Sequence, residues 1–178
     1  MSIAPNTRPR QDRKSIEKLL AKAGVTDKVA LVGIRGYYSK MGPTPGNDRG
    51  LYDDAMFVVS PSAFASFNAN TDPSIFRPKI ATLRPGLHIY KKGKHGISRP
   101  GGGYPALRPA NKNEALPVYR DGVEKPWDGI AINIHKGGYN STSSEGCQTI
   151  YPDQWNSFIN LVYGEMDRYG QKTIPYLL

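Results

Sequence analysis

The chain has few of the features that brace a fold covalently or hold it in a membrane. Its 178 residues include one cysteine and three histidines. A single cysteine excludes an internal disulfide, so the fold must be stable without one. No window approaches the roughly 18 consecutive apolar residues that crossing a bilayer requires. We therefore expect no stable membrane insertion.

Acidic residues are also scarce. Lysine and arginine number 24 against 15 acidic residues, which gives a net charge of +9. This balance favours an anionic partner such as an anionic cell envelope. Zinc-finger spacing and the aromatic pattern of an RNA-binding sheet are both absent, so we expect no nucleic-acid partner. The hydrophobic fraction of 38% is ordinary for a soluble protein, and we expect a monomer.

The length suits one domain with a proper core. Residues 1–14 contain two prolines and four basic side chains, and they predict a flexible basic tail before a single domain over 15–178. The opening residues are followed by no apolar run of signal-peptide length. We therefore expect synthesis in the cytoplasm, with release or delivery before any action on a periplasmic cell wall.

Residue patterns predict an α+β fold that is mostly β, with a few flanking helices. Helices are predicted at 15–23, with Ser15 as N-cap, at 62–67 and at 152–169. Strands are predicted at 28–38, 55–59 and 87–90, as a turned-back strand over 116–123, and at 129–135. The segment 98–109 is rich in proline and glycine, and it predicts a long loop at a functional rim.

The strand predicted at 129–135 delivers a histidine at its end. Its alternation places three isoleucines on the buried face, namely Ile130, Ile132 and Ile134. Asn133 and His135 then share the opposite face. Twelve residues after His135 comes Cys147, with glycines and small hydroxyl residues between them. This arrangement is typical of a nucleophile and its base on one loop.

A nucleophilic thiol has to be ionised, and an unperturbed cysteine has a pKa of about 8.5. His135 is the natural base for Cys147. We interpret His88 and His95 as structural, because one alternates with core residues and the other lies in a predicted turn. An inert core cysteine is the alternative for Cys147, but Gly146 permits a tight turn that directs backbone N–H groups at an oxyanion.

Other cysteine chemistries fit the sequence less well. His135, Glu145 and Cys147 are all able to ligate zinc, but the chain lacks a second cysteine and a His-x-x-x-His pair. We therefore expect no metal and no cofactor. Papain-like and NlpC/P60-type peptidases place the cysteine before the histidine. No histidine follows Cys147, which excludes those families.

The order of histidine, short loop and Ser144-Glu145-Gly146-Cys147 resembles the signature of the YkuD-type L,D-transpeptidase family. That signature is a histidine followed by Ser/Thr-His-Gly-Cys-x-Arg. In this chain Glu145 stands in place of the second histidine, and Gln148-Thr149 replaces the usual Ile/Val-Arg. Divergent members of this family among phage lysins and toxic effectors of bacterial competition show similar shortened motifs.

The resemblance implies a mostly β L,D-transpeptidase-like domain that acts on peptidoglycan stem peptides. Cys147 would attack the carbonyl of the L-centre of diaminopimelate, expel D-alanine and form a thioester. His135 would accept the thiol proton and later activate the acceptor, while N–H groups around Gly146 and Cys147 would steady the oxyanion. Water as the acceptor gives an L,D-carboxypeptidase or endopeptidase, and an amine gives a transpeptidase. A small basic domain favours hydrolysis.

Further loop residues are candidates for peptide contact, and each of them has the shaping of the loop as its alternative role. They are Lys136, Tyr139, Asn140, Ser143, Ser144 and Glu145. Asn133 is a candidate for orienting the imidazole of His135. A different class of function also stays open, namely a non-catalytic wall-binding or phage structural protein. In that case the eleven tyrosines and the proline- and glycine-rich rim would form a binding surface.

Overall fold

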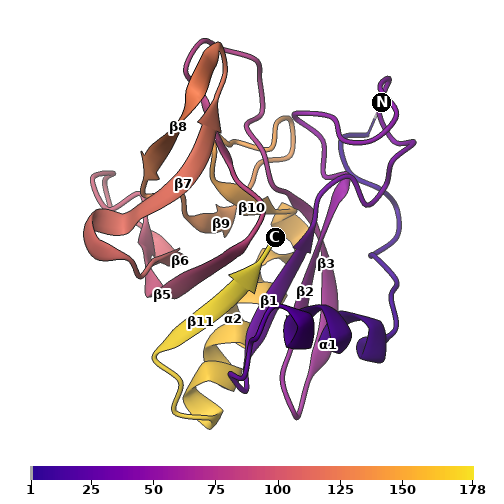
Figure 1. The fold of residues 1–178 in the computed structure, drawn as a ribbon, viewed down its shortest axis with the longest axis vertical. Coiled ribbons are helices and arrows are strands. Elements are labelled where there is room, and N and C mark those ends of the chain that lie inside the picture. Colours follow the sequence, from indigo (N-terminus) through magenta and orange to yellow (C-terminus); the bar gives the residue numbers. More distant parts are fainter. Residues whose placement is uncertain (1) are drawn as a thin grey trace.

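The computed structural model describes residues 2–178, and these residues are mostly β with two α-helices (Figure 1). Eight strands close into a barrel in the order β1-β11-β5-β6-β9-β10-β3-β2. They are β1 (Ala30–Ile34), β2 (Asp54–Val59), β3 (Phe64–Asn70), β5 (Leu87–His95), β6 (Tyr104–Pro109), β9 (Ile134–Lys136), β10 (Gln148–Ile150) and β11 (Thr173–Leu177). The predicted α+β, mostly β fold class is confirmed.

A second, three-stranded sheet projects from the barrel (Figure 1). It consists of β4 (Ala81–Leu83), β7 (Ala115–Arg120) and β8 (Val123–Ile130), with a short 3-10 turn, η1 (Lys112–Glu114), before β7. β7 and β8 form an antiparallel hairpin, which confirms the predicted turn after residue 120. Because β8 leads directly toward β9, this small sheet lies next to the segment that carries His135.

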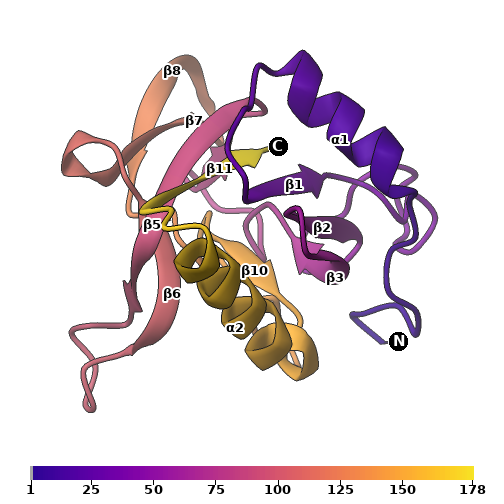
Figure 2. The ribbon, with the colours of Figure 1, turned by 90° about the horizontal axis from the view of Figure 1, so that it is seen from below.

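Helix α2 (Pro152–Arg168) crosses one end of the barrel, close to β5 and β10 (Figure 2). Its buried side chains join the barrel core, and they include Trp155, Phe158, Ile159, Val162 and Met166. Proline is well suited to the first turn of a helix, where its missing N–H costs nothing. The helix predicted from the apolar spacing is therefore confirmed.

Helix α1 (Arg13–Lys22) covers the outer face of β1 and β2, where Ile16 and Leu20 are buried. Its N-cap is Asp12, whose carboxylate accepts a hydrogen bond from the Ser15 N–H at 2.8 Å. The predicted cap at Ser15 is therefore three residues late. The segment predicted as a tail lies against the body: the Ile3 carbonyl accepts from the backbone of residue 52, and the Pro9 carbonyl accepts from the side chain of residue 66.

Two predicted elements are wrong. Residues 64–67 of the helix predicted over 62–67 instead form the start of β3, which pairs with six consecutive residues of β2. Inter-strand pairing outweighs the weak local helix pattern here. Part of the predicted loop 98–109 is strand β6, which pairs with β5 over six residues. Its prolines stand at Pro105 and Pro109, and tertiary pairing again decides the conformation.

The strand predicted at 129–135 is broken into two. β8 ends at Ile130, Ala131 has a positive φ of 54°, and β9 begins at Ile134. The break lets the chain pass from the small sheet to the barrel. Ile130 is consequently 61% exposed, contrary to the prediction, whereas Ile132 and Ile134 are buried as predicted.

Candidate active site

Cys147 and His135 lie on neighbouring strands and on the same face of the barrel sheet. Cys147 directly precedes β10, which runs parallel to β9 with Gln148 opposite Ile134 and Thr149 opposite His135. Alternate residues of a strand face opposite sides, so Cys147 shares its face with His135. The sulfur is 3.7 Å from the carbonyl oxygen of Ala131. The strand register thus places the two predicted catalytic residues at adjacent strands, with the Cys147 thiol donating to the Ala131 carbonyl.

His135 is held in the tautomer that a base requires. Its side chain is 3% exposed, and Nδ1 lies 2.8 Å from the carbonyl oxygen of Lys136. A carbonyl oxygen only accepts, so the hydrogen-bond network assigns the hydrogen to Nδ1 and leaves the lone pair on Nε2. The Tyr104 hydroxyl is also 3.3 Å from Nδ1. Nε2 is therefore the nitrogen available to accept a proton.

Burial shifts the pKa values of both groups toward their neutral forms. Desolvation raises the pKa of the Cys147 thiol to about 11, although a hydrogen bond from the Asn133 N–H opposes the shift. Desolvation, followed by the charge of His95, lowers the pKa of His135 to about 4. At neutral pH the resting site therefore holds a thiol and a neutral imidazole, not the ionised thiol that the sequence suggested.

The turn before Cys147 is built by Ser144 and Gly146. Gly146 has a φ of 129°, and a Cβ placed on it would lie 2.7 Å from the Ala81 carbonyl oxygen, so only glycine fits. Ser144 Oγ donates to the Cys147 carbonyl at 2.7 Å and accepts from the Gly146 N–H at 3.0 Å. Ser144 is buried and shapes this turn.

This turn corrects the predicted oxyanion hole. The Gly146 N–H already donates to Ser144 Oγ, so this N–H is not free to bind an oxyanion. Within residues 2–178, the Cys147 N–H makes no hydrogen bond. The Glu145 N–H likewise has no hydrogen-bond partner within the described residues, so these two N–H groups are the donors that the turn leaves unpaired.

The other predicted contact residues scatter over the loop. The Glu145 carboxylate points to Arg77, 3.0 Å from its guanidinium, and the Tyr139 hydroxyl donates to Asp153 at 2.6 Å. Asn140 and Ser143 are exposed. Lys136 stays close to the site, because its ammonium lies 5.7 Å from the centroid of the Tyr104 ring beside His135.

Sequence reasoning missed His95 and Tyr104. The ring of His95 stacks on that of His135, and Asn133 Nδ2 lies 3.1 Å from His95 Nδ1. Asn133 was predicted to orient His135. Its side chain instead contacts His95. The strand that begins at Leu87 had been predicted to end at Tyr90. It continues as β5 to His95, and the lysines within 91–94 make this continuation difficult to recognise in the sequence. His88 has the structural role predicted, with Nε2 2.8 Å from the Arg84 carbonyl.

No family model, curated protein or solved structure matches the chain. The described residues contain no helix that is long and apolar enough to cross a membrane. Nor do residues 2–178 bring three histidine, cysteine or acidic side chains together as metal ligands.

Proposed function

We propose that the protein is a cysteine-dependent hydrolase of peptidoglycan stem peptides, acting as an L,D-carboxypeptidase or endopeptidase through a thioester on Cys147. The observation that supports this most is the shared sheet face of Cys147 and His135, with the lone pair of His135 on Nε2. The resemblance of residues 135–147 to the YkuD-type signature supplies the substrate class.

The pKa values of the two groups indicate how the thiol reacts. Moving the proton from a thiol of pKa about 11 to an imidazole of pKa about 4 before attack would cost about 10 kcal/mol. That cost argues against a resting ion pair. Proton transfer from Cys147 to Nε2 of His135 therefore accompanies attack of the sulfur on the substrate carbonyl.

The backbone of the site then stabilises the charge that develops. The Cys147 N–H donates to the oxyanion of the tetrahedral intermediate. Protonated His135 returns its proton to the leaving amine, and the thioester remains on the sulfur. His135 next takes a proton from water, which attacks the thioester and releases the shortened peptide.

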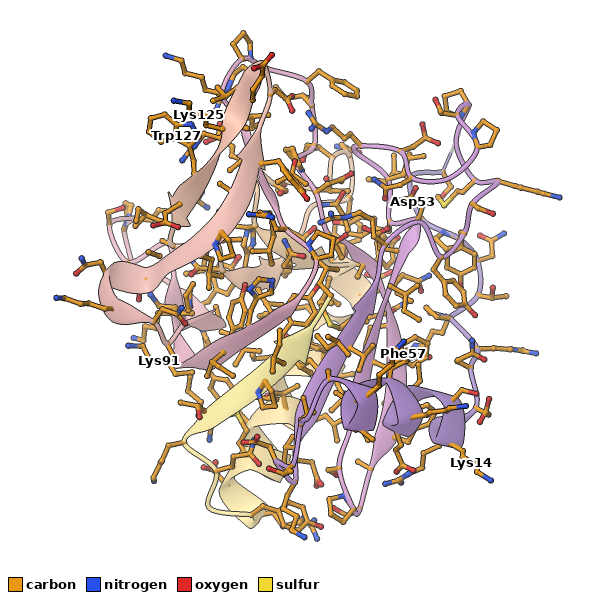
Figure 3. The ribbon with its side chains drawn as sticks, in the orientation of Figure 1. Lys14, Asp53, Phe57, Lys91, Lys125 and Trp127 are labelled. Carbon is orange, nitrogen blue, oxygen red and sulfur yellow. The ribbon has the colours of Figure 1, made fainter. Side chains whose placement is uncertain are left out.

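The distribution of charge suits an anionic cell envelope. Lys14, Lys91 and Lys125 lie on α1, β5 and β8 and project away from the body (Figure 3). Together with the net charge of +9, this spread of lysines favours attachment to an anionic wall from several sides. Such attachment weakens as the salt concentration rises.

Mass spectrometry of purified Gram-negative muropeptides tests the reaction. We expect the wild type to remove terminal D-alanine or to cut cross-links, and Cys147→Ala to do neither. Lys22→Ala, which removes an exposed charge on α1, serves as the control and should retain the activity. Exchanged D-amino acids in the products would identify a transpeptidase instead. Identical products from wild type and Cys147→Ala would overturn the proposal.

A second candidate is a non-catalytic wall-binding protein. The raised pKa of Cys147 favours it, because a neutral buried thiol is unreactive at rest. The muropeptide assay separates the two functions, and sedimentation with insoluble peptidoglycan detects the binding. For a binding protein, wild type and Cys147→Ala would sediment equally and neither would change the muropeptides.

A further inference from the structure

A second imidazole packs against the candidate base. His95, at the end of β5, has its ring centroid 3.8 Å from that of His135, and the two ring planes are inclined by 12°. Aromatic planes this close and this nearly parallel are in van der Waals contact. The two histidines are 40 positions apart in the sequence and are brought together because β6 pairs with both β5 and β9.

Asn133 joins this pair of rings to the cysteine. Its Nδ2 donates to His95 Nδ1 at 3.1 Å, which leaves the hydrogen of His95 on Nε2. The register of β9 and β10 places Asn133 beside Cys147, and burial raises the pKa of that thiol while the Asn133 N–H lowers it. One residue therefore lies next to both His95 and the candidate nucleophile.

We propose that His95 is a positioning residue of this site, whose ring holds the imidazole of His135 on the sheet face that it shares with Cys147. This proposal rests on the proposed function, because it gives His135 the role of base. Two stacked rings cannot both carry a positive charge without strong repulsion, so at most one of the two imidazoles is cationic during the reaction.

Several charged and titratable groups surround the two rings. Burial lowers the pKa of His95 most, followed by the charge of Arg99 in the β5–β6 connection. The pKa of His135 is lowered by burial, then by His95, and least by Arg99. Arg108 of β6 also lowers the pKa of His95. Tyr104 of β6 and the Lys136 carbonyl of β9 contact Nδ1 of His135. A variant at position 95 must leave these groups in place to be informative.

His95→Phe and His95→Ala separate stacking from charge. Phenylalanine keeps a flat ring against His135 but neither titrates nor accepts from Asn133, whereas alanine removes the ring. Lys94→Ala is the matched control, because Lys94 is an exposed cation on the same strand. We would follow the NMR titration of His135 in all four proteins, together with the kcat/KM of D-alanine release.

We expect His135 to titrate at higher pH in His95→Phe than in the wild type, and at its wild-type pH in Lys94→Ala. His95→Ala should lose about 10- to 100-fold in kcat/KM, as expected for a misplaced catalytic group, and His95→Phe should lose less. An unchanged His135 titration in His95→Phe together with unchanged kcat/KM in His95→Ala would overturn the proposal. If the wild type releases no D-alanine, the proposed function fails, and the titration alone then decides whether the rings interact.

Discussion

The sulfur of Cys147 lies at a position where burial and polar contacts compete. Desolvation raises its pKa to about 11, and the negative charge of Glu145 acts in the same direction. The Asn133 N–H and the charge of Arg108 lower the pKa but do not cancel the effect of burial. The reactivity of Cys147 therefore depends on how a bound substrate, which excludes water, alters the surroundings of the thiol.

Alkylation of Cys147 by iodoacetamide should be slow at neutral pH. Only the thiolate reacts, so the rate should increase about tenfold for each pH unit up to a midpoint near 11. The measurement is the mass-spectrometric labelling rate at a series of pH values. A rate that is already constant below pH 7 would mean that His135 ionises the thiol at rest. Cys147→Ala, which removes the only cysteine, gives the background.

At the scale of elements, the turn that delivers Cys147 to β10 depends on one glycine. We expect Gly146→Ala to destabilise the protein by about 1–3 kcal/mol, since alanine at a positive φ is strained and its Cβ would collide with the Ala81 carbonyl. Denaturant unfolding measures this change. Gly164→Ala is the control: this exposed α2 glycine has open space around it, so alanine should stabilise the helix by up to about 1 kcal/mol. Equal stabilities of Gly146→Ala and wild type would contradict the account of the turn.

Elements with strong local patterns could be predicted from the sequence, and those that depend on pairing could not. The spacing of Trp155, Phe158 and Val162 predicted α2 correctly, and Asp121-Gly122 predicted the β7–β8 hairpin. Residues 64–67, predicted as part of a helix, become strand because β2 lies beside them. His135 lies on β9 and Cys147 directly precedes the adjacent strand β10, as their short separation in the sequence suggested. His95 lies beside His135 because β6 pairs with both β5 and β9, and no local sequence pattern predicts this long-range pairing.

At the scale of the whole molecule, a group of buried carboxyls near the end of β2 couples stability to pH. Asp53 precedes β2 at the end of the barrel near the 36–53 loop (Figure 3), and Asp72 follows β3. Burial, and then the charge of Asp54, raises the pKa of both Asp53 and Asp72 to about 7. The folded protein therefore favours the protonated, neutral forms of the Asp53 and Asp72 carboxyls.

The sign of the pH dependence follows from these shifts. A carboxyl whose folded pKa is raised from 3.8 to about 7 contributes stability that is complete below pH 3.8 and is lost as the pH rises through 7. His135 acts in the opposite direction, because its folded pKa is lowered from 6.5 to about 4 and its contribution is lost as the pH falls through that range. The wild-type stability curve therefore combines two opposing slopes.

Asp72→Asn isolates the carboxyl contribution, because asparagine mimics the neutral acid and its carbonyl still accepts from Asn47, as Asp72 does at 2.6 Å. We expect it to be more stable than the wild type by about 2–4 kcal/mol at pH 8, where the native carboxyl is ionised. The gain should shrink toward zero near pH 4, as urea unfolding between pH 4 and 8.5 will show. Asp27→Asn, at an exposed position, should follow the wild-type curve throughout. Parallel curves for Asp72→Asn and wild type would mean that Asp72 is not held neutral, and that the pH response of the fold arises elsewhere.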